Sequence, residues 1–460
     1  MTPFQYIERS SPYSEPSGAS RPVRLVTPAD LDGGTLEAAA MSWARGAGFT
    51  AEPGRLLPVP GTDGDIASAL FGWSGDADGF SAGKLARLLP PGDWHLEGHR
   101  AGRLGHLGFG LGSYGFTRYK AEKQRQARLA VSEVERTELE RQLAGIFLAR
   151  DLINTPTNDM GPDHLEAAFR ALGEHYGATV SSIVGDDLLA QNFPLIHAVG
   201  RASAQVPRLL EMRWGRAGAP KVTLVGKGVC FDTGGLDIKG AANMLLMKKD
   251  MGGAANVMGL ALMVMDAGLD IELRVLVPCV ENAIAGNAFR PGDIYRSRKG
   301  LTVQIDNTDA EGRLILADAL AYADQTPCDL LVDMATLTGA ARVALGPDVA
   351  PFFTDDDELA GRLADISAEE NDPMWRLPLW AGYEKDLKSR VADLTNAPSG
   401  GMAGSITAAL FLKRFVGRKT CWVHFDIYGW TLSEKPHSSV GGEAFGIRTL
   451  YRHIRDLAKQ

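Results

Sequence analysis

The sequence contains little cysteine, with four residues in 460, and no two of them form a CxxC pair. Such scattered thiols argue against a disulfide framework and against a thiolate zinc site, and they are typical of reduced core thiols in a cytosolic protein. The sequence also lacks HExxH and GxSxG motifs, the signatures of two common classes of hydrolase. The four cysteines are Cys230, Cys279, Cys328 and Cys421.

An excess of positive charge is also missing. The formal net charge is −8 and the pI is about 5.7, which opposes non-specific binding to nucleic acid or to an anionic membrane. The most apolar stretches, such as residues 254–267, are too short to span a bilayer. The N-terminal segment has no basic region followed by an apolar run, as a secretory signal would have. We therefore expect a cytoplasmic protein without a membrane or nucleic-acid partner.

The length of 460 residues exceeds the size at which one hydrophobic core stops growing, so two domains are expected. Residues 1–131 are rich in glycine, proline and arginine, and we expect them to form a small N-terminal α/β domain. Gly110, Gly112 and Gly115 match the GxGxxG spacing, but no clear apolar strand precedes them. A glycine-rich turn is therefore favoured over a dinucleotide site.

Residues 132–154 are predicted to form a helix that connects two domains. Ser132 and Glu135 have the spacing of a capping box at its start, and Pro156 follows its end. The expected division is an N-terminal domain over 1–131, the connecting helix over 132–154 and a catalytic domain over 155–460.

Helical and strand patterns alternate through the last 300 residues or so, which predicts a larger α/β domain with a central, mostly parallel or mixed sheet flanked by helices. In such folds ligands bind beyond the carboxyl ends of the strands. Buried strands are expected at 222–225, 274–280, 330–334 and 422–427, and helices at 254–266 and 314–323.

Charged residues cluster after the first of these strands. Lys227, Asp232 and Lys239 lie in a glycine-rich loop, and Asp250 comes just before the next helix. Ordinary structural roles remain open for each of them: Asp250 as a helix cap, Asp232 as a turn residue, and the lysines as solvated surface groups.

A second charged cluster lies between a strand at 302–305 and a helix. In extended backbone Asp309, Glu311 and Arg313 would alternate by two and face the same side. Two carboxylates on one face repel each other unless they are protonated or hold a cation, although an ion pair with the arginine is an alternative. Together the two clusters suit two divalent cations such as Mn, Mg or Zn, with a lysine able to join only as the neutral amine.

The segment NTDAEGRL, residues 307–314, resembles the signature of the leucine aminopeptidase (cytosol aminopeptidase) family. The upstream strings GKGVCFDTGGLDIK and MKKDMGGAA resemble its metal-binding and catalytic segments, and the resemblance covers roughly residues 150–460. It implies that Asp232 and Glu311 bridge two metal ions. The metal ligands it implies are Lys227, Asp232, Asp250, Asp309 and Glu311, and the catalytic residues are Lys239 and Arg313.

The resemblance implies a metal-dependent aminopeptidase that removes the first residue from peptides with a free amino terminus. It further implies two Mn or Zn ions per subunit, a bicarbonate ion at Arg313 acting as general base, and a homohexamer. Met247, Thr336 and Gly339 fall where the family lines its first specificity pocket, which suits a Leu-like or Met-like side chain, although Met247 could instead pack in the core.

The sequence departs from the family near Lys239, with Asp237 where a small hydroxyl residue is usual and Gly240 where proline is usual. If Asp237 faced Lys239, it would raise the pKa of the lysine. Two alternative functions are a narrow dipeptidase, such as a cysteinylglycinase, and a hexameric scaffold or nucleic-acid-binding regulator with incidental peptidase activity. His424 lies in an apolar strand and is interpreted as a core residue.

Overall fold

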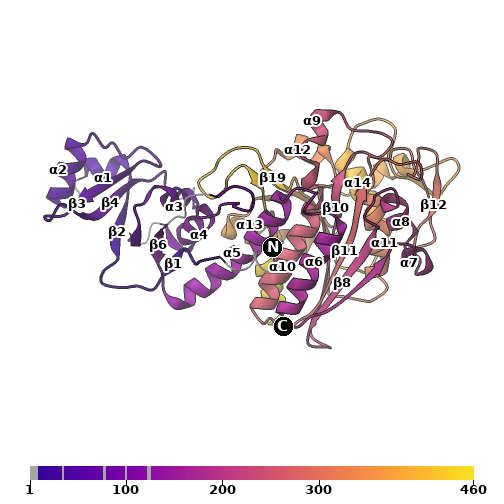
Figure 1. Cartoon of the computed structure of the whole chain (residues 1–460), viewed down its shortest axis with the longest axis horizontal. Coiled ribbons are helices and arrows are strands. Elements are labelled where there is room, and N and C mark those ends of the chain that lie inside the picture. The colour runs from indigo at the N-terminus through magenta and orange to yellow at the C-terminus, as the bar shows by residue number, and fades with distance from the viewer. Residues whose placement is uncertain (1–8, 34–35, 76–78, 99–100, 122–125, 460) are drawn as a thin grey trace. The chain divides into compact units, whose positions relative to one another are not determined.

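The computed structural model describes residues 9–33, 36–75, 79–98, 101–121 and 126–459 (Figure 1). This part of the chain forms two compact units. The smaller unit comprises Arg9–Leu143 and Ser433–Val440, and the larger comprises Ala144–Leu432 and Gly441–Gln460. Within the described residues, no helix combines the length and the apolar character that crossing a bilayer requires.

The smaller unit is an α/β domain, as predicted. Its six-stranded sheet has the order β1-β6-β5-β2-β4-β3, and the strands pair in parallel except at the β3–β4 edge. The strands are β1 (Tyr13–Ser14), β2 (Arg21–Val26), β3 (Leu56–Pro60), β4 (Ile66–Gly72), β5 (Gly92–Glu97) and β6 (Ala127–Ala130). The helices are α1 (Pro28–Asp32), α2 (Ala38–Gly46), α3 (Leu85–Leu88), α4 (Gly102–Gly112) and the 3-10 helix η2 (Ser81–Lys84).

The prediction of a glycine-rich turn is wrong for Gly110 and Gly112, which lie inside α4. A Cβ atom at Gly110 would lie 2.1 Å from the Tyr13 hydroxyl, and one at Gly112 would lie 2.1 Å from the carbonyl oxygen of Gly83. These glycines therefore allow close packing of α4, a requirement that the GxGxxG spacing does not reveal.

The predicted helix after Ser132 is present as α5 (Glu133–Asn154). The Ser132 hydroxyl accepts a hydrogen bond from the Glu135 N–H at 3.4 Å, as the capping pattern predicts. Residues of α5 up to Leu143 belong to the smaller unit, and those from Ala144 belong to the larger.

The larger unit is built on a nine-stranded mixed sheet with the order β16-β15-β18-β14-β9-β11-β8-β7, to which β10 is added beside β11. The four predicted buried strands are confirmed as β9, β11, β14 and β18. The sheet strands are β7 (Thr179–Val184), β8 (Arg208–Gly215), β9 (Lys221–Gly226), β10 (Gly228–Asp232), β11 (Glu272–Asn282), β14 (Leu330–Ala335), β15 (Ala350–Phe353), β16 (Met374–Arg376) and β18 (Trp422–Asp426). Two small sheets contain β12 (Ile294–Arg296), β13 (Thr302–Gln304) and β17 (Leu394–Thr395), and β19 (Trp430–Thr431) and β20 (Gly441–Gly442).

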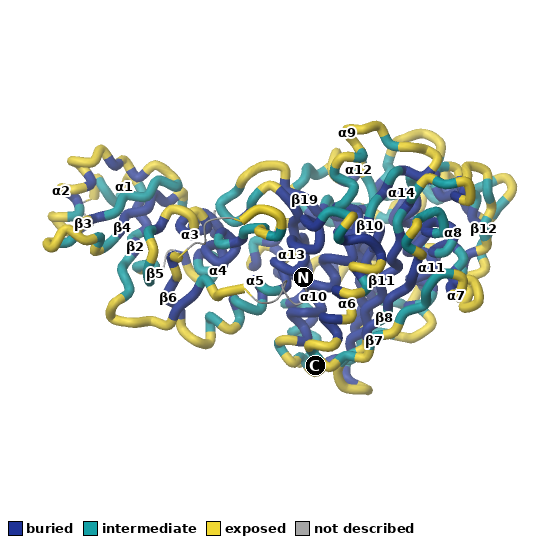
Figure 2. Tube along the Cα trace, in the orientation of Figure 1, coloured by how far each residue is buried: buried dark blue, intermediate teal, exposed yellow. Residues whose placement is uncertain are grey.

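Helices cover both faces of this sheet: Figure 1 shows α6 and α10 on one side of β8 and β11, and α8 and α11 on the other. Helix α10 is apolar on all sides and buried from Gly252 to Met265, which is why it lies in the dark interior of Figure 2. The helices are α6 (Pro162–His175), α7 (Asp187–Ala190), α8 (Pro194–Gly200), α9 (Ala241–Met244), α10 (Gly252–Asp266), α11 (Gly312–Ala323), α12 (Gly339–Leu345), α13 (Asp357–Glu370), α14 (Gly404–Lys413), α15 (Ile447–Leu457) and the 3-10 helices η3 (Met247–Met251) and η4 (Ala381–Leu387).

None of the four cysteines forms a disulfide. Cys230 and Cys279 are buried on the neighbouring strands β10 and β11 with their sulfur atoms 3.8 Å apart, whereas Cys328 and Cys421 are only partly buried. His424 is buried in β18, where its Nδ1 lies 2.6 Å from Asp333 Oδ1, and it is a core residue as interpreted from the sequence.

Candidate active site

The loops that follow the parallel strands carry the predicted site residues. Lys227 follows β9 directly, and Asp232 is the last residue of β10. Asp250 lies in η3, and Glu311 directly precedes α11. Because β9, β10, β11 and β14 pair in parallel, their carboxyl ends meet at one edge of the sheet. All the predicted site residues line one cavity of about 650 Å³ at this edge.

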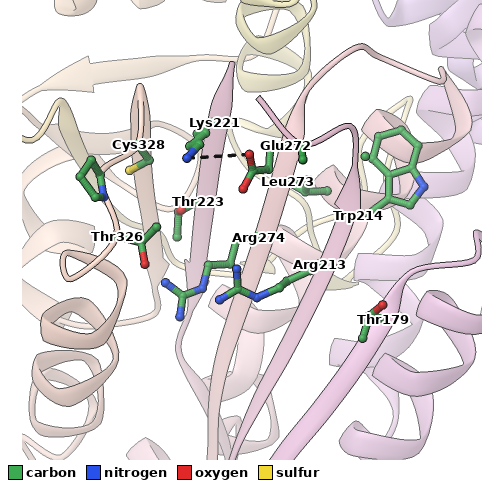
Figure 3. A pocket seen from close by; sticks show the side chains of 13 residues that line it. Thr179, Arg213, Trp214, Lys221, Thr223, Glu272, Leu273, Arg274, Thr326 and Cys328 are labelled. Atoms are coloured by element: carbon green, nitrogen blue, oxygen red, sulfur yellow. Dashed lines mark ion pairs between the residues drawn. The ribbon is translucent and has the colours of Figure 1, made fainter. Parts of the chain in front are cut away.

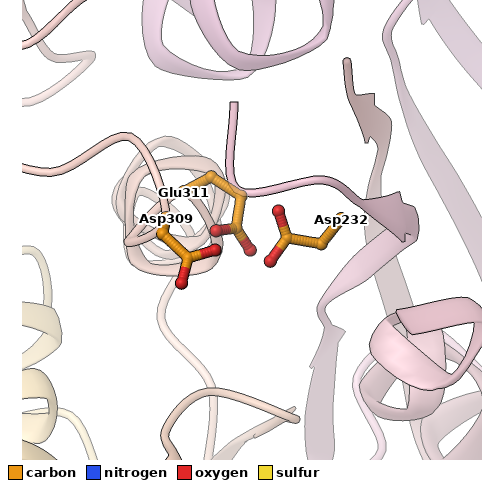
Figure 4. Close-up of side chains that lie close together, drawn as sticks. All are labelled: Asp232, Asp309 and Glu311. Carbon is orange, nitrogen blue, oxygen red and sulfur yellow. The ribbon is translucent and has the colours of Figure 1, made fainter. Parts of the chain in front are cut away.

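Three carboxylates converge in this cavity. One oxygen from each of Asp232, Asp309 and Glu311 lies within 4.8 Å of the others, and Figure 4 shows the three groups pointing toward one another. The predicted extended backbone is wrong, because Asp309 lies in a turn, Glu311 has helical angles (φ −78°, ψ −34°) and Arg313 is inside α11. The carboxylates of Asp309 and Glu311 nevertheless meet, since the turn brings them to the same side.

Lys227 is buried among carboxylates. Its Nζ lies 2.7 Å from Asp250 Oδ2 and 2.9 Å from Glu311 Oε1, and it donates a hydrogen bond to the carbonyl oxygen of Thr336 at 3.0 Å. Burial disfavours the ammonium, but the carboxylates outweigh burial and raise the pKa of Lys227. A Cβ atom at residue 312 would lie 2.6 Å from Lys227 Cε, so the signature segment requires Gly312 at this close approach.

Lys239 holds the opposite side of the carboxylate cluster. Its Nζ lies 2.8 Å from Asp232 Oδ2 and also pairs with Asp309. Burial lowers its pKa, but Asp232 and Glu311 act in the other direction, and the net effect raises the pKa of Lys239. Lys227 and Lys239 are therefore not solvated surface lysines, which was the ordinary alternative.

Asp250 and Asp232 differ in whether they have the ordinary structural roles left open by the sequence, a helix cap for Asp250 and a turn residue for Asp232. Asp250 does not cap α10, since Met251 occupies the capping position; its Oδ1 accepts a hydrogen bond from the Thr336 hydroxyl at 2.9 Å. Asp232 does have the turn role, because its Oδ1 accepts the Gly234 N–H at 2.9 Å, but its second oxygen faces the cavity lysine. The turn therefore orients Asp232 for the cluster.

The electrostatics of the cluster favour a bound cation. Burial and repulsion from Asp232 raise the pKa of Glu311 to about 8, and the same two causes raise the pKa of Asp309 to about 6. Asp250 Oδ2, Asp309 Oδ1 and Glu311 Oε1 are buried, and a lysine ammonium lies beside each of them. Crowded carboxylate oxygens that repel one another fit divalent cations such as Mn, Mg or Zn.

Arg313 is buried beside the cluster without neutralising it. Its Nη1 donates to the carbonyl oxygen of Asn396 at 2.7 Å, its Nε has no hydrogen-bond partner, and burial lowers its pKa to about 10. No carboxylate of the described chain forms an ion pair with Arg313, so the ion-pair alternative for Asp309 and Glu311 is wrong. An unpaired guanidinium edge suits an anion.

Sequence reasoning missed the amides that position the ligand loops. Asn282 Nδ2 donates to Asp232 Oδ1 at 2.8 Å and to the Thr308 carbonyl oxygen at 3.1 Å, which joins the two charged segments. Asn396 does the same for the signature segment, since its Nδ2 donates to the carbonyl oxygen of Asn307 at 2.7 Å. Asn282 and Asn396 lie outside the segments on which the resemblance was based, so neither was recognised from the sequence.

The unusual Asp237 is turned toward Thr308 and does not pair with Lys239. Its Oδ2 accepts the Thr308 N–H at 2.7 Å and the Thr308 hydroxyl at 3.1 Å, and it is not among the leading groups that shift the pKa of Lys239. Gly240 has φ −62° and ψ 151°, angles that proline also adopts. Both departures are therefore compatible with the geometry around Lys239.

The rest of the cavity contains more than the predicted pocket. Met247 is half-buried and lines the cavity with Thr336 and Gly339, so it does not simply pack in the core. Lys249 and Arg342 line the same cavity, and sequence reasoning missed both. The cavity therefore has cationic as well as apolar walls.

The α/β fold and the buried group of carboxylates and lysines define the class of metal-dependent hydrolases. Comparison with known proteins narrows this class. Residues 147–451 match the model of the cytosol aminopeptidase family catalytic domain, and residues 21–132 match that of the M17 aminopeptidase N-terminal domain. The chain belongs to the cytosol aminopeptidase family, and it is therefore an aminopeptidase, a hydrolase that depends on metal.

Individual relatives agree with this assignment. A probable cytosol aminopeptidase of Roseiflexus castenholzii is 40% identical over 365 residues, which cover 75% of this chain and 74% of the relative. The crystal structure of cytosol aminopeptidase from Coxiella burnetii superposes with a TM-score of 0.93 at 44% identity and covers 98% of this chain and 99% of the other. The bottromycin maturation enzyme BotP in complex with Mn has a TM-score of 0.87 at 32% identity, over 96% of this chain and 100% of the other.

Proposed function

We propose that the protein removes the first residue from peptides with a free amino terminus and uses two divalent cations, Mn or Zn, per subunit. The observation that carries this proposal is the group of three carboxylates within 4.8 Å of one another. Carboxylate oxygens of this kind are the ligand atoms that such cations prefer. The Mn complex of BotP makes manganese the first metal to test.

Each side chain of the cluster has a proposed role in holding metal. Asp232 and Glu311 would bridge the two ions, Lys227 and Asp250 would complete one site, and Asp309 would complete the other. Lys227 must lose its proton to bind metal; cations on the carboxylates would remove the attraction that raises the pKa of Lys227. Bound cations would supply Lewis-acid polarisation of the scissile carbonyl and activation of a water molecule.

Lys239 and Arg313 are proposed to act on the reacting groups. Lys239 is more exposed than Lys227 (13% against 3% of the side chain) and is not a proposed ligand, so its amine can stay protonated at neutral pH when cations neutralise the carboxylates. The Lys239 ammonium can then donate a hydrogen bond to the oxygen that gains charge in the transition state. The buried Arg313 guanidinium, with its Nε unpartnered, can hold a bicarbonate ion as general base. The sequence predicts an aliphatic first residue at Met247, Thr336 and Gly339, a preference that the cationic Lys249 and Arg342 of the same cavity would change.

The experiment that tests the function combines metal analysis with substrate blocking. The purified protein is stripped with a chelator, reloaded with Mn or Zn and assayed on leucyl-p-nitroanilide and its N-acetylated form. We expect activity to return with about two metal ions per chain and the acetylated substrate to resist cleavage. Hydrolysis by the metal-free protein, or equal cleavage of both substrates, would contradict the proposal.

A homohexamer and a cytoplasmic location complete the proposal, and both rest on the family likeness. Light scattering coupled to gel filtration measures the first, with six copies of the 49.3 kDa chain as the expected species. Cell fractionation with an antibody against the protein measures the second.

A further inference from the structure

Lys249 is a buried cation in the candidate active site that has no acidic partner. It lies in η3 between Met247 and the proposed ligand Asp250, and only 6% of its surface is exposed. Its ammonium forms no ion pair with a described carboxylate. The Lys249 Nζ lies over the face of the Tyr428 ring, 4.8 Å from the ring centre. Burying an unpaired charge is costly, so such a group at a cavity wall points to a ligand.

The acidic residues nearest to Lys249 are already engaged. Asp250 pairs with Lys227 and accepts the Thr336 hydroxyl. Asp426 accepts two backbone N–H groups, from Leu337 and Thr338 at 3.0 Å each, and further hydrogen bonds from side-chain hydroxyls. Neither carboxylate forms an ion pair with Lys249, and burial outweighs their attraction and lowers the pKa of Lys249 to about 8.

A second cation lies on the same tyrosine. Arg342 in α12 donates a hydrogen bond from Nη1 to the Tyr428 hydroxyl at 3.2 Å, and its guanidinium lies 5.1 Å from the ring centre. No carboxylate of the described residues pairs with Arg342 either. Lys249, Arg342 and Tyr428 all line the cavity that contains the carboxylate cluster. The cavity wall therefore offers an ammonium, a guanidinium and a phenol to one ligand group.

We propose that Lys249 and Arg342 bind a carboxylate on the first side chain of the substrate, so that the enzyme prefers peptides that begin with Asp or Glu. This inference rests on the proposed aminopeptidase function. We place the substrate amine at the metal ion that Lys227 and Asp250 would hold. Lys249 is adjacent in sequence to Asp250, and Thr336 joins Asp250 to the same wall. A side chain attached next to that amine is the substrate group that reaches this wall, and lysine and arginine together match a carboxylate.

The test compares substrates that differ in charge alone. Glutamyl-p-nitroanilide and glutaminyl-p-nitroanilide have nearly the same shape and no carboxyl terminus, so a difference in kcat/KM reports on the side-chain charge. We expect the wild-type enzyme to favour the glutamyl substrate by at least about tenfold. The Lys249→Met variant should abolish most of this preference, and Arg342→Met should reduce it by a smaller factor.

Lys248→Met is the matched control. Lys248 is the sequence neighbour of Lys249, but its Nζ donates to the carbonyl oxygen of Asn154 at 2.7 Å, and it does not line the cavity. Its substitution should leave the glutamyl-to-glutaminyl ratio unchanged. Thermal melting and metal content of each variant separate loss of folding from loss of preference, and the exposed Arg342 provides a second variant if Lys249→Met does not fold.

Three outcomes would overturn the proposal. The first is a wild-type ratio of one or less, and the second is a ratio that Lys249→Met leaves unchanged. The third is that Lys249→Met alters only the discrimination between Leu-Gly and its amide, because the cations would then bind the carboxyl terminus of a short peptide. In each case cleavage of leucyl-p-nitroanilide still supports the proposed function, whereas failure to cleave any free-amine substrate with Mn or Zn would contradict the function itself.

Discussion

The large domain has a charged cavity at each end of its central strands, and the two differ in how their charges are balanced. At the amino ends of β9 and β14 a cavity of about 260 Å³ is lined by residues of β8, β9 and β11 and by the segment 326–328 that precedes β14 (Figure 3). Each of its cations has an acidic partner: Lys221 lies 3.9 Å from Glu272, and Arg213 and Arg274 lie 2.6 and 2.9 Å from Glu211. At the carboxyl ends, carboxylates crowd together, and Lys249 and Arg342 form no ion pair with any carboxylate in the described part of the chain.

This difference separates charges that stabilise a surface from charges arranged for a ligand. The partly exposed Lys221–Glu272 pair contributes between about 0 and 1 kcal/mol, and the buried Arg274 already has Glu211 as its partner. Crowded carboxylates and the unpaired, buried Lys249 instead raise the free energy of the empty site, and a bound ligand relieves that cost. The comparison therefore assigns chemistry to one end of the sheet and structural support to the other.

The largest expected effect comes from removing a carboxylate of the cluster. Glu311→Ala should lower kcat/KM by at least about 10³-fold, because it removes a carboxylate proposed to hold both metal ions and so weakens binding of the metal that would activate water. Asp309→Ala should have an effect of the same kind. Metal analysis after dialysis and circular dichroism measure metal loss and fold retention; wild-type turnover by either variant would reverse the assignment of the two cavities.

Arg313→Ala is expected to have the next largest effect. It removes the group proposed to hold bicarbonate, and kcat should fall by roughly 10²-fold while the metal content stays at the wild-type value. Titration of bicarbonate in degassed buffer is the measurement. The wild-type rate should rise with bicarbonate and the rate of the variant should not; a variant that still responds to bicarbonate would place the general base elsewhere.

A smaller effect is predicted for Asp237, which is part of the carboxyl-end cavity but touches no proposed metal ligand. Asp237→Ala removes the acceptor of the Thr308 N–H and so loosens the turn that presents Asp309. Substitution of residues that form hydrogen bonds to metal ligands typically lowers metal affinity by about 10- to 100-fold. Competition with a chelator should show weaker Mn binding for Asp237→Ala than for Asp237→Asn, which keeps an acceptor oxygen. Equal Mn affinities of the two variants would mean that the hydrogen bond from Thr308 to Asp237 does not support the metal site.

The sequence allowed the fold and most of the site to be predicted, because both depend on local patterns. Continuous apolar runs identified β9, β11, β14 and β18, and the charged residues directly after them fall at one edge of a parallel sheet. The signature segment then identified the carboxylates that converge. Each of these patterns spans only a few neighbouring residues. It can therefore be recognised without knowledge of the long-range contacts.

The remaining features depend on contacts between distant segments. The direction of the Asp237 side chain is set by Thr308, 71 residues away, and no local pattern encodes that contact. The string MKKD does not distinguish Lys248 from Lys249. In the structure the turn of η3 directs Lys248 toward Asn154 and Lys249 toward Tyr428. The helical path of residues 311–313 was missed because alternation by two fits an extended chain equally well.

The smallest expected effect lies in the amino-end cavity, and it tests the other half of the comparison. Lys221→Ala removes a side chain that pairs with Glu272 at 3.9 Å and lies at the start of β9, the strand whose far end carries Lys227. We expect kcat/KM within twofold of wild type and a change of no more than about 1 kcal/mol in the free energy of unfolding, because the pair is partly exposed to solvent. Denaturant unfolding and a full kinetic profile with the glutamyl and leucyl substrates measure both quantities. A large loss of activity with intact stability would mean that the two ends of β9 are coupled, and the division between a chemical and a structural end of the sheet would then be wrong.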